Sequence, residues 1–347
     1  MTSSDPFPVR PAVDAPRPPW RRHLAARWHL LPVAVALAVL VLARCVANPV
    51  ATPPPAPEGM AFVACGQRCA VDAPVVLWTH APNYDAYQTR KRFADDEPDG
   101  KLRYAPVRGN LPAALAARAG ADGLDLADLQ QVVHQFVLHF DVAGTSRQCF
   151  KILQDVRTLS VHFLLDVDGT IYQTLDLREK AWHATIANDY SIGVEIAHPG
   201  DFPQPLGAPM RTWYEKDAQG WRVKFPKWMT ELGIRTPDFV ARPDRPDVIA
   251  GEVQGRTLYQ FDYTPQQYRS LIALCAALNR VFPRIRLDAP RDAAGAIRTS
   301  ALPAEELAAF DGIVGHFHVQ TNKTDPGPAF QWERVLQQAR EQRAKLR

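Results

Sequence analysis

The chain has 347 residues, and 40 Lys and Arg against 37 Asp and Glu leave a formal net charge of +3. This length can bury a sizeable core in one large or two small domains. The nearly balanced charge lacks the clustered basic stripe of a nucleic-acid-binding protein, so we expect no nucleic acid as a partner. No glycine-rich phosphate loop occurs, which argues against a nucleotide-dependent enzyme.

The N-terminal part of the chain has the pattern of a targeting region. A basic, Pro-rich tail (1–29) precedes an apolar segment (30–48), the layout of a signal peptide or membrane anchor, and a Pro-rich linker (49–60) follows. The sequence LARC, which ends at Cys45, resembles a bacterial lipobox imperfectly. An uncleaved anchor, acylation at Cys45 and cleavage therefore all stay open. The basic flank predicts that the remainder faces the periplasm or the outside of a bacterial envelope, held by a membrane or lipid anchor.

Five cysteines in an exported chain suggest disulfides. With Cys45 in the membrane segment, Cys65 and Cys69 are near enough in sequence to predict a local bridge. For Cys149 and Cys275, a disulfide and reduced, buried thiols are equally open.

The rest of the chain divides into two parts. Residues 61–130 show little periodicity apart from a candidate strand at 75–78, and are predicted to be an extension packed on the main domain. Residues 131–345 alternate strands with helices, which predicts an α/β fold with a central mixed β-sheet flanked by helices. Within this domain, residues 199–262 are rich in Pro, Gly and Trp, and predict a long loop insertion that shapes access to the site.

The clearest secondary-structure signals lie in the main domain. Alternating and apolar runs predict strands at 136–140, 161–166, 170–175 and 192–197, with the hairpin turn Asp168-Gly169 between the middle two. Caps and apolar spacing predict helices from Thr145 or Ser146 to about 159, from Thr264 to 282, and over 330–345.

Three candidate metal ligands lie at a predicted strand end and in a loop. His139 lies near the carboxyl end of the strand 136–140, where α/β folds present reactive groups, although a satisfied core histidine is the alternative. His316 and Asp325 lie in the segment 315–328, whose Pro and Gly residues allow a loop that folds back on itself. Two imidazoles and a carboxylate leave a fourth position open, which is the arrangement of a catalytic zinc site.

Two further charged residues can face the same centre. Glu195 lies on a predicted strand between Gly193 and Ala197, whose small side chains would leave room for a substrate above the sheet. A glutamate beside a zinc-bound water is the usual general base of a metal hydrolase, whereas an exposed strand glutamate is the alternative. Lys323 lies two residues before Asp325, so in an extended segment both side chains project to the same side.

Taken together, these segments resemble the zinc-dependent N-acetylmuramoyl-L-alanine amidases, of the type that includes animal peptidoglycan recognition proteins. The resemblance spans roughly residues 131–335, in family order. The matching segments are VLH (137–139), SVHFLLDVDGTIYQ (160–173), AWHA (181–184), NDYSIGVE (188–195), GH (315–316) and KTDPGP (323–328).

The resemblance implies zinc ligands at His139, His316 and Asp325, a catalytic role for Glu195, and stabilisation of the oxyanion by Lys323. The expected reaction is zinc-dependent hydrolysis of the amide between N-acetylmuramic acid and L-alanine, in peptidoglycan or muropeptides. The alternatives are a non-catalytic peptidoglycan-binding module and a zinc peptidase acting on the stem peptide. We expect a monomer.

The resemblance also implies that Trp182 and His183 line the substrate groove. His162 precedes a buried strand and is expected to be structural, and His318 is expected to support the ligands rather than to bind the metal. The chain departs from the family pattern in two places. The stretch between Glu195 and His316 is longer than in compact family members, and the loop that follows His316 is about one residue shorter.

Overall fold

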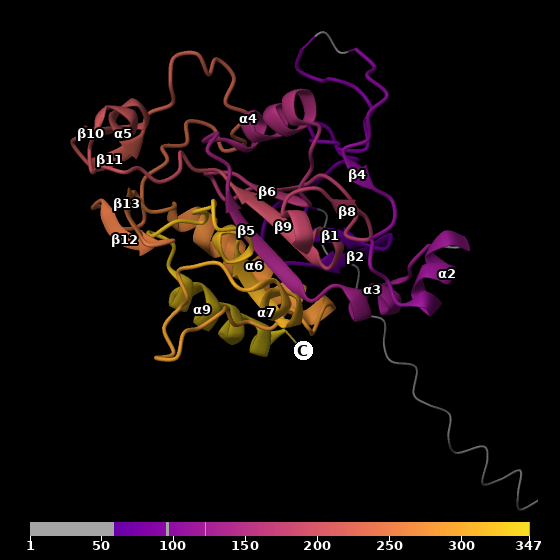
Figure 1. Cartoon of the computed structure of the whole chain (residues 1–347). Helices are drawn as coiled ribbons and strands as arrows, with labels where there is room; N and C mark the ends of the chain where they lie inside the picture. The colour runs from indigo at the N-terminus through magenta and orange to yellow at the C-terminus, as the bar shows by residue number, and fades with distance from the viewer. Residues whose placement is uncertain (1–58, 95–96, 122, 347) are drawn as a thin grey trace, which may run out of the picture. The chain divides into compact units, whose positions relative to one another are not determined.

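The structure is a computed structural model that describes residues 59–94, 97–121 and 123–346 (Figure 1). The predictions for the tail 1–29, the signal or anchor segment 30–48 and nearly all of the linker 49–60 fall outside these residues. In the part of the chain that is described, no helix combines the length and apolar character needed to cross a membrane.

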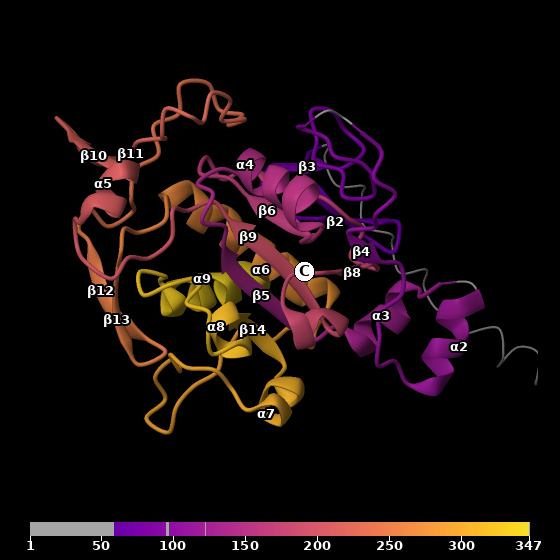
Figure 2. The ribbon, with the colours of Figure 1, turned by 45° about the horizontal axis from the view of Figure 1, so that its top comes forward.

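A mixed sheet of six strands forms the centre of the domain (Figures 1 and 2). Its strands are β3 (Val75–Leu77), β5 (Gln135–Phe140), β6 (Phe163–Leu165), β7 (Ile171–Gln173), β9 (Ser191–Ile196) and β14 (Gly312–Gly315). They lie in the order β14-β5-β9-β6-β7-β3, and every neighbouring pair is parallel except β6 and β7. The predicted turn Asp168-Gly169 joins this antiparallel pair. The prediction of an α/β fold with a central mixed sheet is therefore confirmed.

Two long helices, α6 (Pro265–Val281) and α9 (Trp332–Lys345), cover one face of the sheet (Figure 2). The predicted capping box starts α6: Gln267 N donates to Thr264 Oγ1 at 3.1 Å, and Thr264 N donates to Gln267 Oε1 at 2.9 Å. Alternate residues of the strands pack against the helices and form the main core. These strand residues are Phe136, Leu138, Phe140, Ile192, Val194 and Ile196.

Two smaller clusters cover the opposite face. The helix α4 (Ser146–Lys151), capped by Thr145 and continued by the π-helical turn η1 (Ile152–Arg157), packs over Leu164 and Tyr172. The helices α7 (Ala304–Ala309) and α8 (His316–Val319) pack over Val137 and Val314. Between these clusters lie two of the candidate site residues, His139 on β5 and Glu195 on β9.

The extension before the main domain supplies the edge strand β3 and several small elements. These are β1 (Ala61–Ala64), β2 (Gln67–Ala70), β4 (Tyr104–Ala105), α2 (Ala113–Ala121) and α3 (Leu126–Val132). The strand β4 pairs with β8 (Lys180–Ala181), directly before the predicted groove residues Trp182 and His183. The extension thus contacts the sheet and the main domain through strand pairing as well as side-chain packing.

The predicted bridge between Cys65 and Cys69 is wrong, because both cysteines are free. Cys65 and Gly66 form the two-residue turn between β1 and β2, at φ 49° and 74°, while Cys69 pairs with Phe62 inside the ladder. Backbone hydrogen bonds therefore close this hairpin. Burial raises the pKa of the Cys69 thiol to about 11, which keeps it protonated at neutral pH.

The segment 199–262 is not the long loop that its composition predicts. It contains α5 (Ala208–Trp213), a first hairpin β10 (Tyr214–Asp217) with β11 (Gly220–Val223), and a second hairpin β12 (Ile249–Val253) with β13 (Arg256–Gln260). The second hairpin turns at Gln254 and Gly255, whose φ angles of 54° and 68° suit a two-residue turn. Both hairpins lie on the same side of the domain (Figures 1 and 2).

Candidate active site

His139, His316 and Asp325 converge at the carboxyl ends of neighbouring parallel strands. His139 comes from the end of β5, His316 follows β14 directly, and Asp325 comes from the loop after α8. His139 Nδ1 lies 2.9 Å from His316 Nδ1 and 3.0 Å from Asp325 Oδ2, and His316 Nδ1 lies 2.9 Å from the same oxygen. All three side chains are buried. The triangle of ligand atoms is compact enough to hold one metal ion.

The donor set fits zinc in composition and spacing. Two ligand atoms of a tetrahedral zinc site lie roughly 3.3 Å apart when each bond is about 2.0–2.1 Å long. The three separations of 2.9–3.0 Å are slightly shorter, so a small outward movement would accommodate the ion. Two imidazoles and one carboxylate also leave a fourth position for water, as catalytic zinc sites do.

The second nitrogen of each imidazole has a partner that orients the ring. His316 Nε2 lies 2.8 Å from Gln320 Oε1, and His139 Nε2 lies 3.0 Å from His183 Nδ1. An imidazole that donates from Nε2 keeps the lone pair on Nδ1, which is the nitrogen that points to the centre of the site. His183 Nε2 in turn lies 3.4 Å from Ser191 Oγ, which extends the chain of contacts.

His183 occupies the space that the sequence predicts to be open above Gly193. A Cβ atom at Gly193 would lie 2.5 Å from the imidazole of His183, so this glycine allows the ring to approach the sheet. The expectation of free space for a substrate at Gly193 is therefore wrong. Trp182 is half-buried, and its backbone N donates to Ser160 Oγ at 3.2 Å. A contact of His183 or Trp182 with substrate stays a prediction.

The charges of the site favour a cation. Burial, together with a smaller effect of the neighbouring His316, lowers the pKa of His139 to about 4. Burial alone would raise the pKa of Asp325, but the imidazoles of His316 and His139 outweigh this effect and hold it below its usual value. A neutral imidazole and an ionised carboxylate are the forms that bind a metal.

Glu195 lies beside this centre with an unused oxygen. It is the cross-strand partner of His139, and its Oε2 is buried without a hydrogen-bond partner. Burial raises the pKa of Glu195 well above its usual value, and the nearby Asp325 and Asp141 raise it further. The ammonium of Lys323 opposes this shift, so Lys323 also lies near Glu195.

The segment 315–328 folds back as expected, although it begins with the helical turn α8 rather than as a loop. Phe317 N donates to the backbone oxygen of Asp325 at 3.1 Å, which closes the segment. A Cβ atom at Gly315 would lie 2.7 Å from Pro326 Cδ, so only glycine lets the two ends of the segment approach this closely. The fold-back carries Lys323 and Asp325 to the carboxyl ends of the strands.

Among the described residues, four other buried histidines contact backbone groups and lie outside the ligand set, and one of them, His134, lies with its Nδ1 3.1 Å from Phe310 O. His162 Nδ1 accepts from Gly193 N at 3.1 Å, His198 Nδ1 accepts from Gly200 N at 2.9 Å, and His318 Nδ1 accepts from Gly315 N at 2.9 Å. His162 thus has the contacts of the structural residue that was expected. His318 supports the start of α8 through its backbone.

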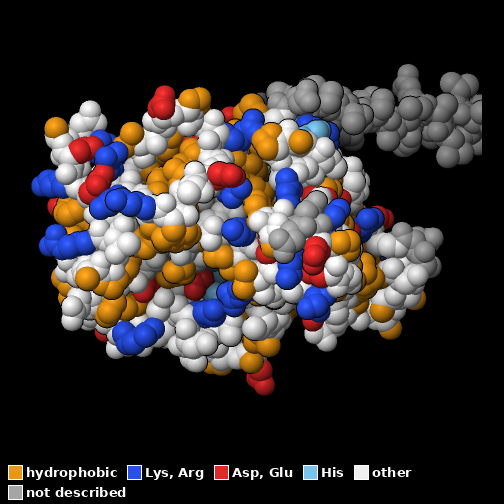
Figure 3. Space-filling view, turned by 90° about the horizontal axis from the view of Figure 1, so that it is seen from above, with side chains coloured by type: hydrophobic (Ala, Val, Ile, Leu, Met, Phe, Trp, Pro, Cys, Tyr) orange, Lys and Arg blue, Asp and Glu red, His pale blue; other side chains and the backbone are white. Residues whose placement is uncertain are grey.

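Sequence reasoning missed Gln320, the partner of His316. The two residues are four apart across the helical turn α8, a spacing at which side chains meet. That spacing is the signal that could have found Gln320. Figure 3 shows a hollow in this face of the molecule, with acidic and histidine side chains at its bottom.

Two imidazoles and a carboxylate thus converge at one edge of the sheet, beside a glutamate oxygen that has no hydrogen-bond partner. These are the residues of a metal-dependent hydrolase. The model of the family described as N-acetylmuramoyl-L-alanine amidase matches residues 129–328, more than half of the chain. The protein belongs to this family. A search of curated proteins found no match.

Three solved structures are similar to this chain. The amidase AmiD from E. coli, in complex with anhydro-N-acetylmuramic acid-L-Ala-D-gamma-Glu-L-Lys, is 19% identical at a TM-score of 0.33, over 59% of this chain and 57% of that chain. The endolysin amidase LysCS from Clostridium intestinale is 16% identical at a TM-score of 0.30, over 63% and 86%. A selenomethionine derivative of AmpD is 18% identical at a TM-score of 0.29, over 80% and 98%. The chain thus covers less than two thirds of the length of AmiD.

Proposed function

We propose that this protein hydrolyses the amide bond between N-acetylmuramic acid and L-alanine in peptidoglycan or muropeptides, with zinc as its cofactor. The observation that carries the proposal is the pairing of His139, a member of the metal-binding triangle, with Glu195, whose buried oxygen has no partner. Membership of the amidase family supports the choice of bond.

The cofactor and the general base would have separate roles in the reaction. His139, His316 and Asp325 would hold the ion, and zinc in such a site acidifies water and polarises a carbonyl group. Glu195 accepts the proton from the attacking water, because its raised pKa places it nearer the working pH than an ordinary carboxylate. It then gives this proton to the nitrogen of L-alanine as the carbon–nitrogen bond breaks. The products are the lactyl carboxylate and a free amino terminus.

Lys323 has the position and charge to stabilise the oxyanion that develops on the carbonyl oxygen. Its ammonium acts on the pKa of both His139 and Glu195, which supports a position close to the metal site. A fixed positive charge in a buried site is worth more than the same charge in water. Trp182 and His183 are proposed to line the groove that receives the glycopeptide.

Digestion of purified sacculi tests the proposal. The expected products are muramic acid with a free lactyl carboxylate and peptides that start with L-alanine, both identified by mass spectrometry. New termini inside the stem peptide would instead identify a zinc peptidase. Binding to sacculi without any new terminus would identify a peptidoglycan-binding module.

We also propose that the catalytic domain acts in the bacterial envelope as a monomer, tethered by the segment 30–48 or by a lipid at Cys45. The basic flank and the apolar run support this placement. Fractionation of cells that express the full chain, followed by mass measurement of the membrane-bound form, distinguishes an anchor, an acylated Cys45 and a cleaved product. Recovery of the unprocessed chain in the cytosol would contradict the proposal.

A further inference from the structure

The tip of the β12–β13 hairpin contacts the segment that carries the ligands. Gln254, the first residue of the hairpin turn, donates from Nε2 to Phe317 O at 2.8 Å and to Gln320 O at 3.0 Å. The same nitrogen lies 3.4 Å from Lys323 O, and Gln254 Oε1 accepts from Ala301 N at 3.2 Å. The side-chain amide of Gln254 thus contacts three backbone carbonyls of the segment that carries the candidate ligands, and also the backbone of Ala301.

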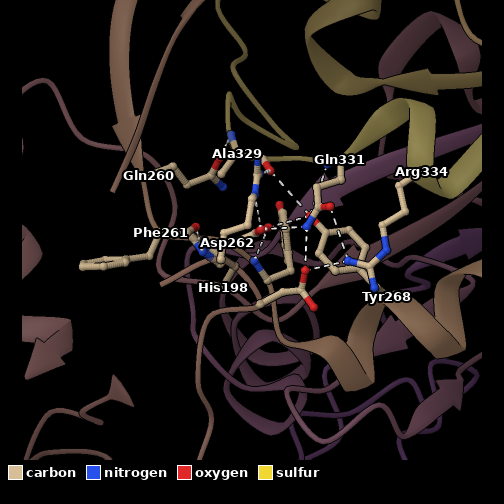
Figure 4. A network of polar contacts seen from close by, with 11 residues as sticks. His198, Gln260, Phe261, Asp262, Tyr268, Ala329, Gln331 and Arg334 are labelled. Carbon is tan, nitrogen blue, oxygen red and sulfur yellow. Dashed lines mark hydrogen bonds and ion pairs between the residues drawn. The ribbon is translucent and has the colours of Figure 1, made fainter. Parts of the chain in front are cut away.

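The base of the hairpin holds the other end of the same segment. Gln260 Nε2 and Tyr263 Oη donate to Pro326 O at 3.1 and 2.7 Å, directly after the ligand Asp325. Gln260 Oε1 accepts from Ala329 N at 2.8 Å (Figure 4). The insertion therefore grips the ligand segment at both ends.

A network of hydrogen bonds around Asp262 holds the base of the hairpin in place. Asp262 accepts from Arg245 Nε at 2.6 Å, from Tyr268 Oη at 2.6 Å and from Gln331 Nε2 at 2.8 Å (Figure 4). Arg245 also contacts Ala329 O. These contacts join the insertion to α6 and to the start of α9, so the grip is anchored on the helices that cover the opposite face of the sheet.

The contacts of Gln254 lead to two functional groups. Gln320, whose carbonyl Gln254 binds, uses its own side chain to orient His316. The Lys323 carbonyl is the third group at the same amide. At the start of the insertion, Asp201 also lies near the side chain of Thr324, between Lys323 and Asp325. Movement of the hairpin tip would therefore shift both a metal ligand and the lysine.

We propose that the insertion 199–262 is a brace for the active site, and that Gln254 is a positioning residue that sets Lys323 and, through Gln320, the metal ligand His316. The effects on kcat that this proposal predicts rest on the proposed amidase function. It assigns to the insertion a role in the chemistry, in addition to any role in access.

Gln254→Glu tests the brace with nearly the same side-chain shape. The substitution keeps an acceptor for Ala301 N but turns the donor toward Phe317, Gln320 and Lys323 into an oxygen that repels their carbonyls. We expect a loss of about 10- to 100-fold in kcat and in zinc affinity, the size typical for partners that orient metal ligands. KM should stay near the parent value, because the side-chain amide of Gln254 bonds backbone groups of the protein. Zinc affinity is measured on the full chain by competition with a chelator.

Two further variants separate positioning from folding. Gln254→Gly removes the amide while suiting the positive φ of the turn, so the hairpin is retained and the same losses are expected. Glu252→Gln changes an exposed side chain on the same hairpin and should match the parent in both kcat and zinc affinity. Thermal unfolding of each variant checks that the fold is kept.

A double-mutant cycle with Lys323→Met tests the path to the lysine. If Gln254 acts through Lys323, Gln254→Glu should cost less in kcat when Lys323 is already replaced. Parent values of kcat and zinc affinity in both Gln254→Glu and Gln254→Gly would overturn the brace. A parent enzyme without amidase activity would instead overturn the proposed function, and the zinc affinities would still decide whether Gln254 positions His316.

Discussion

His139 and Glu195 are direct neighbours across the parallel strands β5 and β9. The sheet fixes this pairing, because a slip of either strand by one residue would turn its side chain to the face that α6 covers. The same row continues through Leu164 and Tyr172, which α4 buries. The candidate ligand His139 and the candidate base Glu195 are thus the two members of this row that the covering helices leave available for chemistry.

Asp325→Asn tests the ligand set. The neutral amide is a poor zinc ligand, and the imidazoles that hold the pKa of Asp325 low would lose their ionised partner. Zinc affinity should fall by more than the 10- to 100-fold typical of outer partners, and activity should fall with it. Zinc content after dialysis against a chelator measures the effect. Retention of zinc at the parent level would exclude Asp325 as a ligand.

Lys323→Met tests the oxyanion role. The methionine keeps most of the apolar stem and removes the charge, so zinc should stay bound at the parent stoichiometry. Loss of one oxyanion donor costs roughly 10²–10³ in kcat. Steady-state kinetics on a soluble muropeptide, beside zinc content, provide the comparison. A variant that loses zinc instead would place Lys323 among the groups that hold the site together.

His183→Gln tests whether His183 orients His139. His183 Nδ1 lies 3.0 Å from His139 Nε2, so we expect the zinc affinity of His183→Gln to fall by about 10- to 100-fold. His198→Gln is the matched control, because this buried histidine bonds the backbone oxygen of Phe261 and lies outside the ligand set. It should lower stability without changing zinc affinity. Equal zinc affinities for both variants and the parent would exclude the orienting role.

A stability prediction concerns Asp166, which is buried beside α4. Burial raises its pKa from 3.8 to about 8, so the unfolded chain releases this proton at lower pH than the folded chain. The stability that Asp166 contributes is fully present below its unfolded pKa and is lost as the pH rises toward 8. Across this pH window, the free energy of unfolding of Asp166→Asn should therefore rise relative to that of the parent by up to about 1.4 kcal/mol per pH unit. Urea unfolding from pH 4 to 8 measures the difference, which would stay constant if Asp166 were ionised in the fold.

The sequence predicted secondary structure best where the pattern lies within a single strand or a single helical turn. The alternation in 136–140 and the apolar run 192–197 predicted β5 and β9, and the capping box at Thr264 predicted the start of α6. These signals are local, because they depend on side-chain periodicity and on contacts within one turn. His139 and Glu195 were therefore placed on the correct strands, whereas β14, the strand that ends directly before His316, was not predicted.

The remaining features depend on contacts between distant segments. The two hairpins in 199–262 were missed because their strands are only four or five residues long and give no clear period, while the segment around them is rich in Pro and Gly. No local pattern indicates that Gln254 reaches Phe317, or that His183 fills the space over Gly193. The spacing of Cys65 and Cys69 predicted a disulfide, whereas the register of β1 and β2 assigns one cysteine to the turn and the other to the ladder.

The most direct test of the account compares Glu195→Gln with the parent, measuring zinc content and sacculus hydrolysis on the same preparations. The amide is nearly isosteric, so the fold and the zinc site should survive. Loss of general base catalysis costs roughly 10²–10⁴ in rate. We therefore predict a variant with parent zinc content and hydrolysis slower by that factor. Hydrolysis by Glu195→Gln at the parent rate would contradict the assignment of Glu195 as the base.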